Sequence, residues 1–233
     1  MKILVVAAHP DDEILGCGGS MAVWAQAGHE VHVVILAEGA TSRDETRNRD
    51  TRSDELTMLQ QCAHAAGEIL GVASVKLLAM PDNRMDSIDR LDVIKTVEQE
   101  IESVKPDMVV THHVGDVNID HQITHEAVVI ACRPQPGHCV RRLQSFEVPS
   151  STEWQPPGSA PAFQPTCYVD ISQTLGLKIK ALEAYASEMR QWPHSRSLEA
   201  AEHLARWRGA SVGCEAAEAF QLMSSNSRFE NGK

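Results

Sequence analysis

Apolar runs alternate with amphipathic segments through the first half of the chain. Continuous apolar runs predict buried strands at residues 3–8, 31–37, 75–79 and 108–111. Segments with helical spacing separate them, at residues 13–27, 44–70, 88–104 and 119–132, and the second of these is polar at first and ends at Gly71. Strands that alternate with helices are typical of βαβ units. The pattern therefore predicts a three-layer α/β/α fold with a Rossmann-like, mostly parallel sheet.

The second half is less regular. Seven prolines punctuate residues 133–165, and we interpret 134–165 as an excursion beside the active site, with one strand at 143–148. A strand at 168–171 and helices at 173–188 and 198–208 close the fold. We expect one domain over residues 1–223 and a frayed tail over 224–233.

The composition of the chain restricts the classes of molecule that the protein could bind. The 233 residues suffice for one large domain, and a net charge of -11 makes the average surface repel phosphate backbones, so nucleic-acid binding is disfavoured. Aromatic residues make up only 4% of the chain, which leaves little for an extended stacking groove. We expect a small substrate that is held by hydrogen bonds.

The cysteines and the amino-terminal residues indicate in which cellular compartment the protein is expected. The six cysteines are widely spaced and form no C-x-x-C pair, which is typical of reduced thiols. The apolar run at residues 3–8 has no cleavage site and is too short to span a bilayer. We expect a cytoplasmic protein without membrane insertion.

The first chemical motif is His9-Pro10-Asp11-Asp12-Glu13, directly after the first predicted strand. Ligand crevices of parallel sheets lie at the carboxyl ends of the strands. Imidazole and carboxylate groups are both good zinc ligands, and Asp11 can face a bound water. The alternative is that the acids only cap the next helix, but capping does not require His9.

A second cluster follows the strand at 108–111, beginning at His112-His113 and continuing through Asn118, Asp120 and His121 to His125. Several histidines and carboxylates on a loop that faces the first motif are unusual as mere structure. His121 and His125 have the i, i+4 spacing of H-E-x-x-H metalloproteases, but Gln122 stands where the catalytic glutamate would be. His125 is therefore interpreted as a supporting residue.

At these motifs the chain resembles the LmbE-like or PIG-L family of zinc-dependent de-N-acetylases, which act on N-acetylglucosamine-type substrates. The resemblance rests on 8–13 (AHPDDE) and on Asp120-His121, with weaker agreement at 81–84, 131–134 and 193–197. It implies that His9, Asp12 and His121 bind zinc and that Asp11 is the general base in a hydrolysis that releases acetate. Fe²⁺ or Co²⁺ can occupy similar sites.

One departure from the family pattern affects the proton donor. Many members have His-Pro-Asp-His in the second motif, whereas this chain has Asn118-Ile119-Asp120-His121. Asn118 can donate a hydrogen bond but cannot act as an acid. His113 and His194 are the candidates for the missing role, and Asp120 is a candidate for orienting His121.

Further candidates for substrate binding follow the other predicted strands. Arg43 lies after the second strand, and Asp82, Asn83 and Arg84 lie after the third. His194 is a candidate from the carboxyl-terminal part of the chain. The alternatives, a helix start at Asp44 and an ordinary turn at Asp82, remain open.

Two rival functions remain open as well. A zinc hydratase or lyase on the same scaffold is the first, because an activated water can also add to a conjugated double bond. A non-enzymatic metal- or sugar-binding module is the second, and the presence of Asp11 beside a complete ligand set argues against it. Self-association is a further hypothesis, from the excursion and the often oligomeric family.

Overall fold

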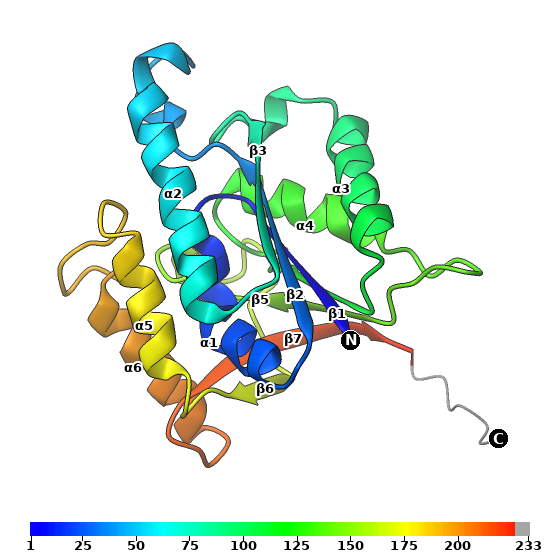
Figure 1. Ribbon diagram of the computed structural model, residues 1–233, viewed down its shortest axis with the longest axis vertical. Helices are drawn as coiled ribbons and strands as arrows, with labels where there is room; N and C mark the ends of the chain where they lie inside the picture. Colours follow the sequence, from blue (N-terminus) through cyan, green and yellow to red (C-terminus); the bar gives the residue numbers. More distant parts are fainter. Residues whose placement is uncertain (227–233) are drawn as a thin grey trace.

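The computed structural model describes residues 1–226, in which a seven-stranded sheet lies between helical layers (Figure 1). The strands are β1 (Lys2–Ala7), β2 (Glu30–Ala37), β3 (Ser74–Met80), β4 (Met108–His112), β5 (Arg142–Phe146), β6 (Cys167–Asp170) and β7 (Ala217–Ser225). The α-helices are α1 (Asp12–Gln26), α2 (Ser53–Leu70), α3 (Arg90–Val104), α4 (Ile119–Ala131), α5 (Leu175–Ala184) and α6 (Leu198–Ala210). Short 3-10 turns are η1 (Thr41–Arg43), η2 (Asp50–Arg52), η3 (Met85–Ser87) and η4 (Thr152–Trp154).

The strand order is β3-β2-β1-β4-β5-β7-β6. The first five strands in this order are parallel, and β7 pairs antiparallel with both β5 and β6. The chain moves outward from β1 to β3 and then returns to place β4 on the other side of β1. This reversal between β1 and β4 is the point at which Rossmann-like sheets bind ligands. The Rossmann-like, mostly parallel sheet predicted from the sequence is confirmed.

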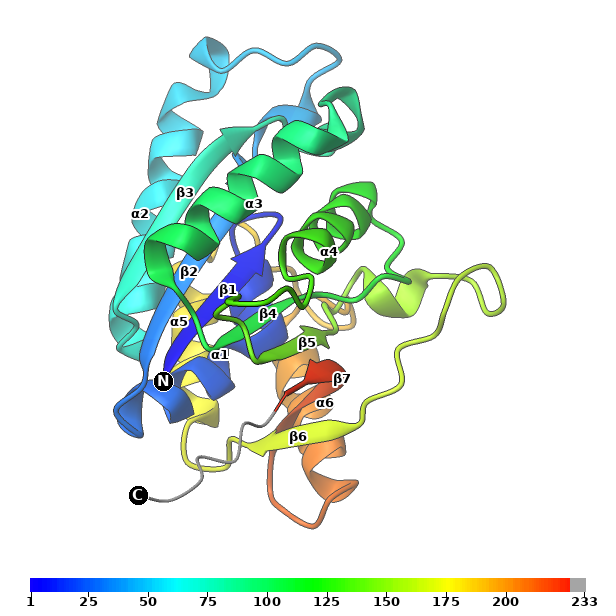
Figure 2. The same cartoon turned by 90° about the vertical axis from the view of Figure 1, so that its right-hand side faces the viewer.

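Alternate residues of β1 point to the two faces of the sheet, as strand geometry requires. Ile3, Val5 and Ala7 belong to a core shared with α1, α2 and α5. Leu4 and Val6 belong to a second core shared with α3 and α4. Figure 1 shows the two helical layers on opposite sides of the sheet, and in Figure 2 the layer of α3 and α4 faces the viewer. Because β1 is buried on both faces, its sequence reads as a continuous apolar run.

Helix α1 is broken near its middle. Cys17 has φ -149° and ψ 23°, which interrupts the helical hydrogen bonds. Gly16 lies against the Phe146 ring so closely that an added Cβ would collide with it. Gly16 therefore allows close packing of α1 against Phe146 at the end of β5.

Strand β7 is the element that the sequence analysis missed. It lies between β5 and β6, so the strand predicted at 168–171 becomes the edge of the sheet and pairs with β7. The frayed tail expected from Ser224 is wrong at its start, because Ser224 and Ser225 pair with β5. Residues 227–233 of that expected tail lie outside the described residues.

The helices of residues 1–226 include none with both the length and the apolar character needed to cross a bilayer. Helix α5 is shorter than the 173–188 segment expected from the sequence, because its regular part ends at Ala184. The excursion contains β5 and the turn η4, and it returns to the sheet at β6.

Candidate active site

The crevice at the carboxyl ends of the strands is formed by loops that follow β1, β3 and β4. His9 and Asp11 come from the turn between β1 and α1, Asp82 follows β3, and His121 lies in the first turn of α4. The β1 turn is tight because Asp11 adopts a left-handed backbone (φ 99°, ψ -26°). Asp and Asn tolerate this conformation better than most residues. The turn brings His9 and Asp12 to the same side.

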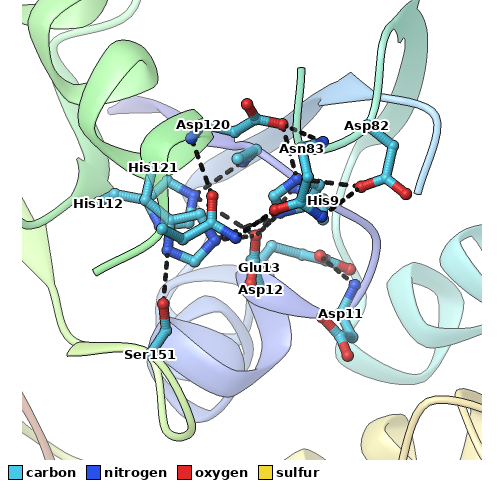
Figure 3. Close-up of polar contacts among 12 residues, drawn as sticks. His9, Asp11, Asp12, Glu13, Asp82, Asn83, His112, Asp120, His121 and Ser151 are labelled. Carbon is cyan, nitrogen blue, oxygen red and sulfur yellow. Dashed lines mark hydrogen bonds and ion pairs between the residues drawn. The ribbon is translucent and has the colours of Figure 1, made fainter. Parts of the chain in front are cut away.

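Three atoms of this crevice are spaced like the ligands of one metal ion. His9 Nδ1 lies 3.2 Å from Asp12 Oδ2 and 3.3 Å from His121 Nε2, and His121 Nε2 lies 3.1 Å from Asp12 Oδ2. Bonds of about 2.0–2.2 Å to a tetrahedral zinc ion place ligand atoms roughly 3.3–3.6 Å apart. The donor set and its spacing therefore fit a divalent transition metal (Figure 3).

The second nitrogen of each histidine faces a buried carboxylate. His9 Nε2 lies 3.0 Å from Asp120 Oδ2, and His121 Nδ1 lies 3.1 Å from Asp116 Oδ2. Such contacts fix the tautomer and the ring orientation of metal-binding histidines. The sequence analysis assigned Asp120 to His121. In the structure Asp120 orients His9 instead, because its side chain points back across the crevice from α4.

The protonation preferences of these groups favour binding of a cation. Burial opposes the charged form of Asp12, but His121 and His9 outweigh it and hold the pKa of its carboxyl well below the ordinary value. Burial also opposes protonation of His121, yet Asp12 and Asp116 raise its pKa to about 9. Protons and metal ions compete for the same lone pairs. The excess of carboxylates that attracts protons to the histidines would equally attract a divalent cation.

Asp11 lies apart from the three ligand atoms (Figure 3). Burial raises the pKa of its carboxyl to about 7, and the nearby Arg196 guanidinium opposes this increase. Arg196 Nη1 lies 3.4 Å from Asp11 Oδ2, and Arg196 Nε donates to Ser150 Oγ at 2.9 Å. A carboxylate with a pKa near neutrality is well suited to accept and return a proton.

Glu13 stabilises the turn between β1 and α1 through its side chain. Its Oε2 accepts from the Asp11 backbone N–H at 3.1 Å, and its Oε1 accepts from the Tyr185 hydroxyl at 2.7 Å. Burial raises the pKa of Glu13 to about 8, although the Tyr185 hydrogen bond favours the charged form. Glu13 and Tyr185 thus tie the left-handed turn to the segment after α5.

Asn118 caps helix α4 and connects it to Asn83. Its Oδ1 accepts from the Asp120 backbone N–H at 2.8 Å, which caps α4, and its Nδ2 donates to Asn83 Oδ1 at 2.8 Å. The Asn83 backbone N–H donates to Asp120 Oδ2 at 2.7 Å. Asp82 is buried beside these residues, with Oδ1 at 3.4 Å from His9 Nε2. The structure therefore brings Asp82, Asn83 and Asn118 to one edge of the metal-ligand cluster.

A second carboxylate grouping shares His9. His9 Nε2, one oxygen of Asp82 and one oxygen of Asp120 also lie within 4.8 Å of one another. Asp120 already accepts the backbone N–H groups of Asn83 and Met85, at 2.7 and 3.0 Å. This grouping orients His9 rather than offering a second open site.

The two arginines predicted to bind substrate are used for contacts within the protein. Arg43 forms ion pairs with Glu55 and Glu188. Arg84 donates to the carbonyl groups of residues 44 and 45, at 3.0 and 2.8 Å. Both side chains hold the segment between β2 and α2 at the rim of the crevice.

Three further histidines of the sequence analysis, His113, His125 and His194, have different surroundings. His113 Nε2 lies 2.9 Å from the Pro161 carbonyl oxygen, which ties the β4 loop to the excursion. His125 turns Nδ1 to the carbonyl of His112 at 2.8 Å, as expected for a supporting residue. The His194 ring packs edge to face with Trp154 at a centroid distance of 5.7 Å.

Several contributors had no role assigned from the sequence. Asp116 orients His121 and accepts hydrogen bonds from Ser151 and Thr152. The His112 ring stacks on His121 at 4.0 Å, and its Nε2 accepts from the Ala8 N–H at 2.8 Å. Arg196 reaches Asp11 from far along the chain. Asp116 and His112 lie within the second motif and could have been suspected, but Arg196 gave no local signal.

Curated relatives are enzymes of two kinds. The chain is 26% identical over 187 residues to the "Uncharacterized deacetylase YaiS" of Escherichia coli (strain K12), covering 79% of this chain and 90% of that protein. It is 29% identical over 218 residues to a 4-oxalmesaconate hydratase of Pseudomonas putida, covering 82% of this chain and 75% of that protein. Sequence similarity therefore extends to a deacetylase and to a hydratase.

A solved structure has the same fold. The N,N'-diacetylchitobiose deacetylase from Pyrococcus horikoshii superposes with a TM-score of 0.76 at 19% identity, over 96% of this chain and 84% of that one. Residues 4–132, which contain both motifs of the crevice, match the family described as "PIG-L: GlcNAc-PI de-N-acetylase". The chain belongs to this PIG-L, or LmbE-like, family.

Proposed function

We propose that this protein is a zinc-dependent hydrolase that removes the N-acetyl group from an N-acetylglucosamine-type amino sugar or glycoconjugate and releases acetate. The observation that carries the proposal is the spacing of His9 Nδ1, Asp12 Oδ2 and His121 Nε2, at 3.1–3.3 Å, beside a carboxylate that is not a ligand. Fe²⁺ or Co²⁺ are the alternative metals, because nitrogen and oxygen donors accept them as well.

Zinc held by His9, Asp12 and His121 would supply a Lewis acid for the acyl carbonyl and would lower the pKa of water toward about 7. In this proposal the Asp11 carboxylate takes the proton from the attacking water, and its pKa of about 7 supports this role because it lets the group gain and lose a proton near neutrality. The same carboxyl can return the proton to the departing amine. Acetate and a free amino group are then the products.

Arg196 supports this role of Asp11. Its guanidinium remains charged and lies 3.4 Å from Asp11 Oδ2, so it stabilises the anionic base. It cannot act as an acid. Asn118 cannot either, and both ends of its amide are occupied by Asp120 and Asn83. We infer that Asp11 carries out both proton transfers in this chain. Many members of the family have a histidine for part of this role where this chain has Asn118. His113 is assigned a supporting role, because it contacts the excursion.

Substrate contacts are proposed at the edges of the crevice. Asp82 lies beside His9, and the Asn83 backbone contacts Asp120. His194 accepts from the backbone N–H of Arg196, whose side chain contacts Asp11. We propose that these three residues bind hydroxyl groups of the sugar. Arg43 and Arg84 are proposed to act indirectly, by holding the β2–α2 segment that borders the site.

The test is acetate release from a panel of N-acetylated amino sugars, their nucleotide derivatives and their glycosides. The wild-type protein loaded with zinc is compared with Asp11→Asn, because asparagine tolerates the left-handed backbone of Asp11 (φ 99°) better than alanine. We expect zinc-dependent release by the wild type and a decrease in kcat of about 10²–10⁴-fold in the variant. The bound zinc should be unchanged. Absence of acetate across the panel, with metal bound, would refute the deacetylase.

A hydratase is the second candidate, favoured by the 29% identity to the 4-oxalmesaconate hydratase. The presence of Asn118 where many de-N-acetylases of the family have a histidine also favours the hydratase. Water added to a conjugated double bond removes its ultraviolet absorbance and releases no acetate. A decrease in the absorbance of conjugated unsaturated acids, lost in Asp11→Asn, would identify this activity instead.

We also propose that the protein acts in the cytoplasm and self-associates. The absence of a C-x-x-C pair among six widely spaced cysteines supports the first proposal, and the excursion around β5 and η4 offers a surface for the second. Sedimentation velocity tests self-association, which a monomer at micromolar concentration would exclude.

A further inference from the structure

A second pocket lies at the opposite end of the sheet from the candidate active site, where β1, β4 and β5 begin. We call it the basal pocket, and its lining includes Trp24, Met108, Arg141, Arg142, Gln144 and Val169. Its volume of about 340 Å³ falls within the range of small-molecule sites, roughly 300–1,000 Å³. Met108 and His112 are the two ends of β4, so at about 3.3 Å per residue their Cα atoms are about 13 Å apart. The basal pocket is therefore separate from the crevice.

Two arginines at the start of β5 bring positive charge to the basal pocket. Arg142 Nε donates to Gln144 Oε1 at 3.1 Å, and neither Arg142 nor Arg141 forms an ion pair within residues 1–226. By contrast, Arg196 and Arg208 each contact a carboxylate. A guanidinium remains charged at neutral pH, and its N–H groups match the oxygens of a carboxylate or a phosphate. Arg141 and Arg142 therefore have donors left for an anion.

An amide donor lies buried in the wall of the basal pocket. Gln144 is 1% exposed, and because Arg142 Nε can only donate, their contact fixes the amide oxygen on the Arg142 side. The Nε2 group then faces away from Arg142 and donates to no group of the described residues. It is not sealed from solvent, unlike the partnerless hydroxyl of Ser145 on the same strand. A ligand oxygen that accepts from Nε2 would recover the free energy of an unmade hydrogen bond.

The remaining lining sets the charge balance and the polarity of the basal pocket. Asp107 contributes a carboxylate, which accepts the Lys2 backbone N–H at 2.9 Å and forms no ion pair with either arginine in the described part of the chain. Two guanidinium groups thus face one carboxylate, in a chain whose net charge is -11. Trp24 and Val169 add apolar surface. The basal pocket combines positive charge, unpaired N–H donors and an apolar wall.

We propose that the basal pocket binds a small organic anion. Its phosphate or carboxylate group is held by Arg141, Arg142 and the Gln144 amide, and its apolar part lies against Trp24 and Val169. Such a ligand neutralises the excess positive charge and satisfies the buried amide donor. It differs in chemistry from the amino sugar proposed for the crevice, and the inference does not depend on the deacetylase activity.

The test is calorimetric titration of the zinc-loaded protein with phenyl phosphate, benzoate and phenol. The three probes share a ring, but phenol lacks the anionic group. We expect at least one of the two anions to bind and phenol not to bind, and the tighter anion identifies phosphate or carboxylate as the preferred group. Absence of binding by both anions, or equal binding of phenol, would overturn the proposal.

Substitutions locate the bound anion. Arg142→Gln should lower the affinity at least about 10-fold, as expected for loss of a charge-assisted hydrogen bond, and Gln144→Leu should lower it by removing the amide donor. Arg133→Gln is the matched control, because Arg133 is exposed, forms no ion pair within residues 1–226 and lies outside the basal pocket. Equal affinities of Arg142→Gln and Arg133→Gln would place the anion elsewhere.

Binding at the metal is distinguished by His121→Ala, because an anion can also bind zinc in the crevice. This variant lacks a proposed zinc ligand, and one molecule of the anion should still bind it with the wild-type affinity. Loss of binding in His121→Ala, together with unchanged affinity in Arg142→Gln, would place the anion at the metal and end the proposal of a basal site.

Discussion

The charge of the crevice depends on a small number of carboxylates around two imidazole rings. His9 lies between Asp12 and Asp120, and His121 lies between Asp12 and Asp116. In each ring one nitrogen faces the shared ligand position and the other faces a buried acid that accepts its proton. This arrangement presents neutral histidine lone pairs and one carboxylate to a metal, which is the usual donor set of catalytic zinc.

Substitution of the two orienting acids tests which histidine each one serves. Asp116→Asn should leave the donor geometry of His121 poorly fixed and lower zinc affinity about 10–100-fold, the usual effect of such partners. Asp120→Asn should lower it through His9 instead. Competition with a chromogenic chelator measures both affinities.

The double variant distinguishes the roles further. If the two acids act on different histidines, their effects on zinc affinity should add in Asp116→Asn/Asp120→Asn. His121→Ala should abolish the effect of Asp116→Asn but preserve that of Asp120→Asn. The reverse pattern would restore the assignment of Asp120 to His121 made from the sequence.

Helix α1 shows how distant elements complete a broken hydrogen-bond ladder. Beyond the break at Cys17, the backbone N–H groups of Gly19 and Ser20 donate to Glu218 on β7, at 3.0 and 2.6 Å. Lys178 on α5 donates to the Leu15 carbonyl at 2.8 Å and to Glu218 at 2.6 Å. Both charged side chains are buried. A buried pair therefore caps both halves of the helix that begins at Asp12.

Breaking this pair should be costly. Lys178→Met leaves Glu218 buried without its cation and should lower the free energy of unfolding by about 3–5 kcal/mol. The double variant Lys178→Met/Glu218→Gln should lose less than the sum of the single variants, because no uncompensated charge remains. Urea denaturation measures these differences.

Arg206→Met is the matched control. Arg206 pairs with Glu202 on the exposed face of α6, at 2.8 Å, and its loss should change the free energy of unfolding by at most about 0.5 kcal/mol. An effect of Lys178→Met no larger than that of Arg206→Met would contradict the capping role of the buried pair.

The excursion is held at the crevice by a close backbone approach. A Cβ added at Gly115 would collide with the Pro161 carbonyl, the same group that contacts His113 Nε2 at 2.9 Å. Gly115→Ala should therefore displace the excursion, lower the free energy of unfolding by about 1–3 kcal/mol and reduce activity. Thermal unfolding and acetate release measure the two effects. Gly176→Ala is the control, because an added Cβ there meets no atom within 4 Å.

At the scale of the whole molecule, the proposed metal site joins loops from both sides of the switch point between β1 and β4. A ligand that binds only the folded state stabilises it by mass action, about 4 kcal/mol at a free concentration of 1,000 times Kd. For a domain of this size that corresponds to an increase in Tm of roughly 8–16 °C. Removal of zinc with a chelator should therefore lower Tm, and addition of zinc should restore it. In His121→Ala the chelator should have little effect; an equal decrease in that variant would place the stabilising metal elsewhere.

Much of the architecture could be predicted from local pattern. Strands buried on both faces read as apolar runs, the helices between them repeat at helical spacing, and the ligand candidates His9, Asp12 and His121 follow β1 and β4 directly. These features could be predicted because each depends on residues that are close together in the sequence. A few neighbouring residues set the periodicity of a strand or helix and show where a strand ends and its loop begins.

Tertiary structure alone decided the rest. β7 contains no β-branched residue and begins with Ala217-Glu218-Ala219, and it is a strand because β5 and β6 pair with it on both sides. Arg196 meets Asp11 across 185 positions of sequence, and Glu218 meets Lys178 across 40. Nothing in the neighbourhood of either residue specifies its partner. The sequence by itself determined the layered fold and the motifs that carry the candidate metal ligands. Long-range contacts decided which acid lies against which histidine, because those contacts depend on where the folded backbone directs each side chain.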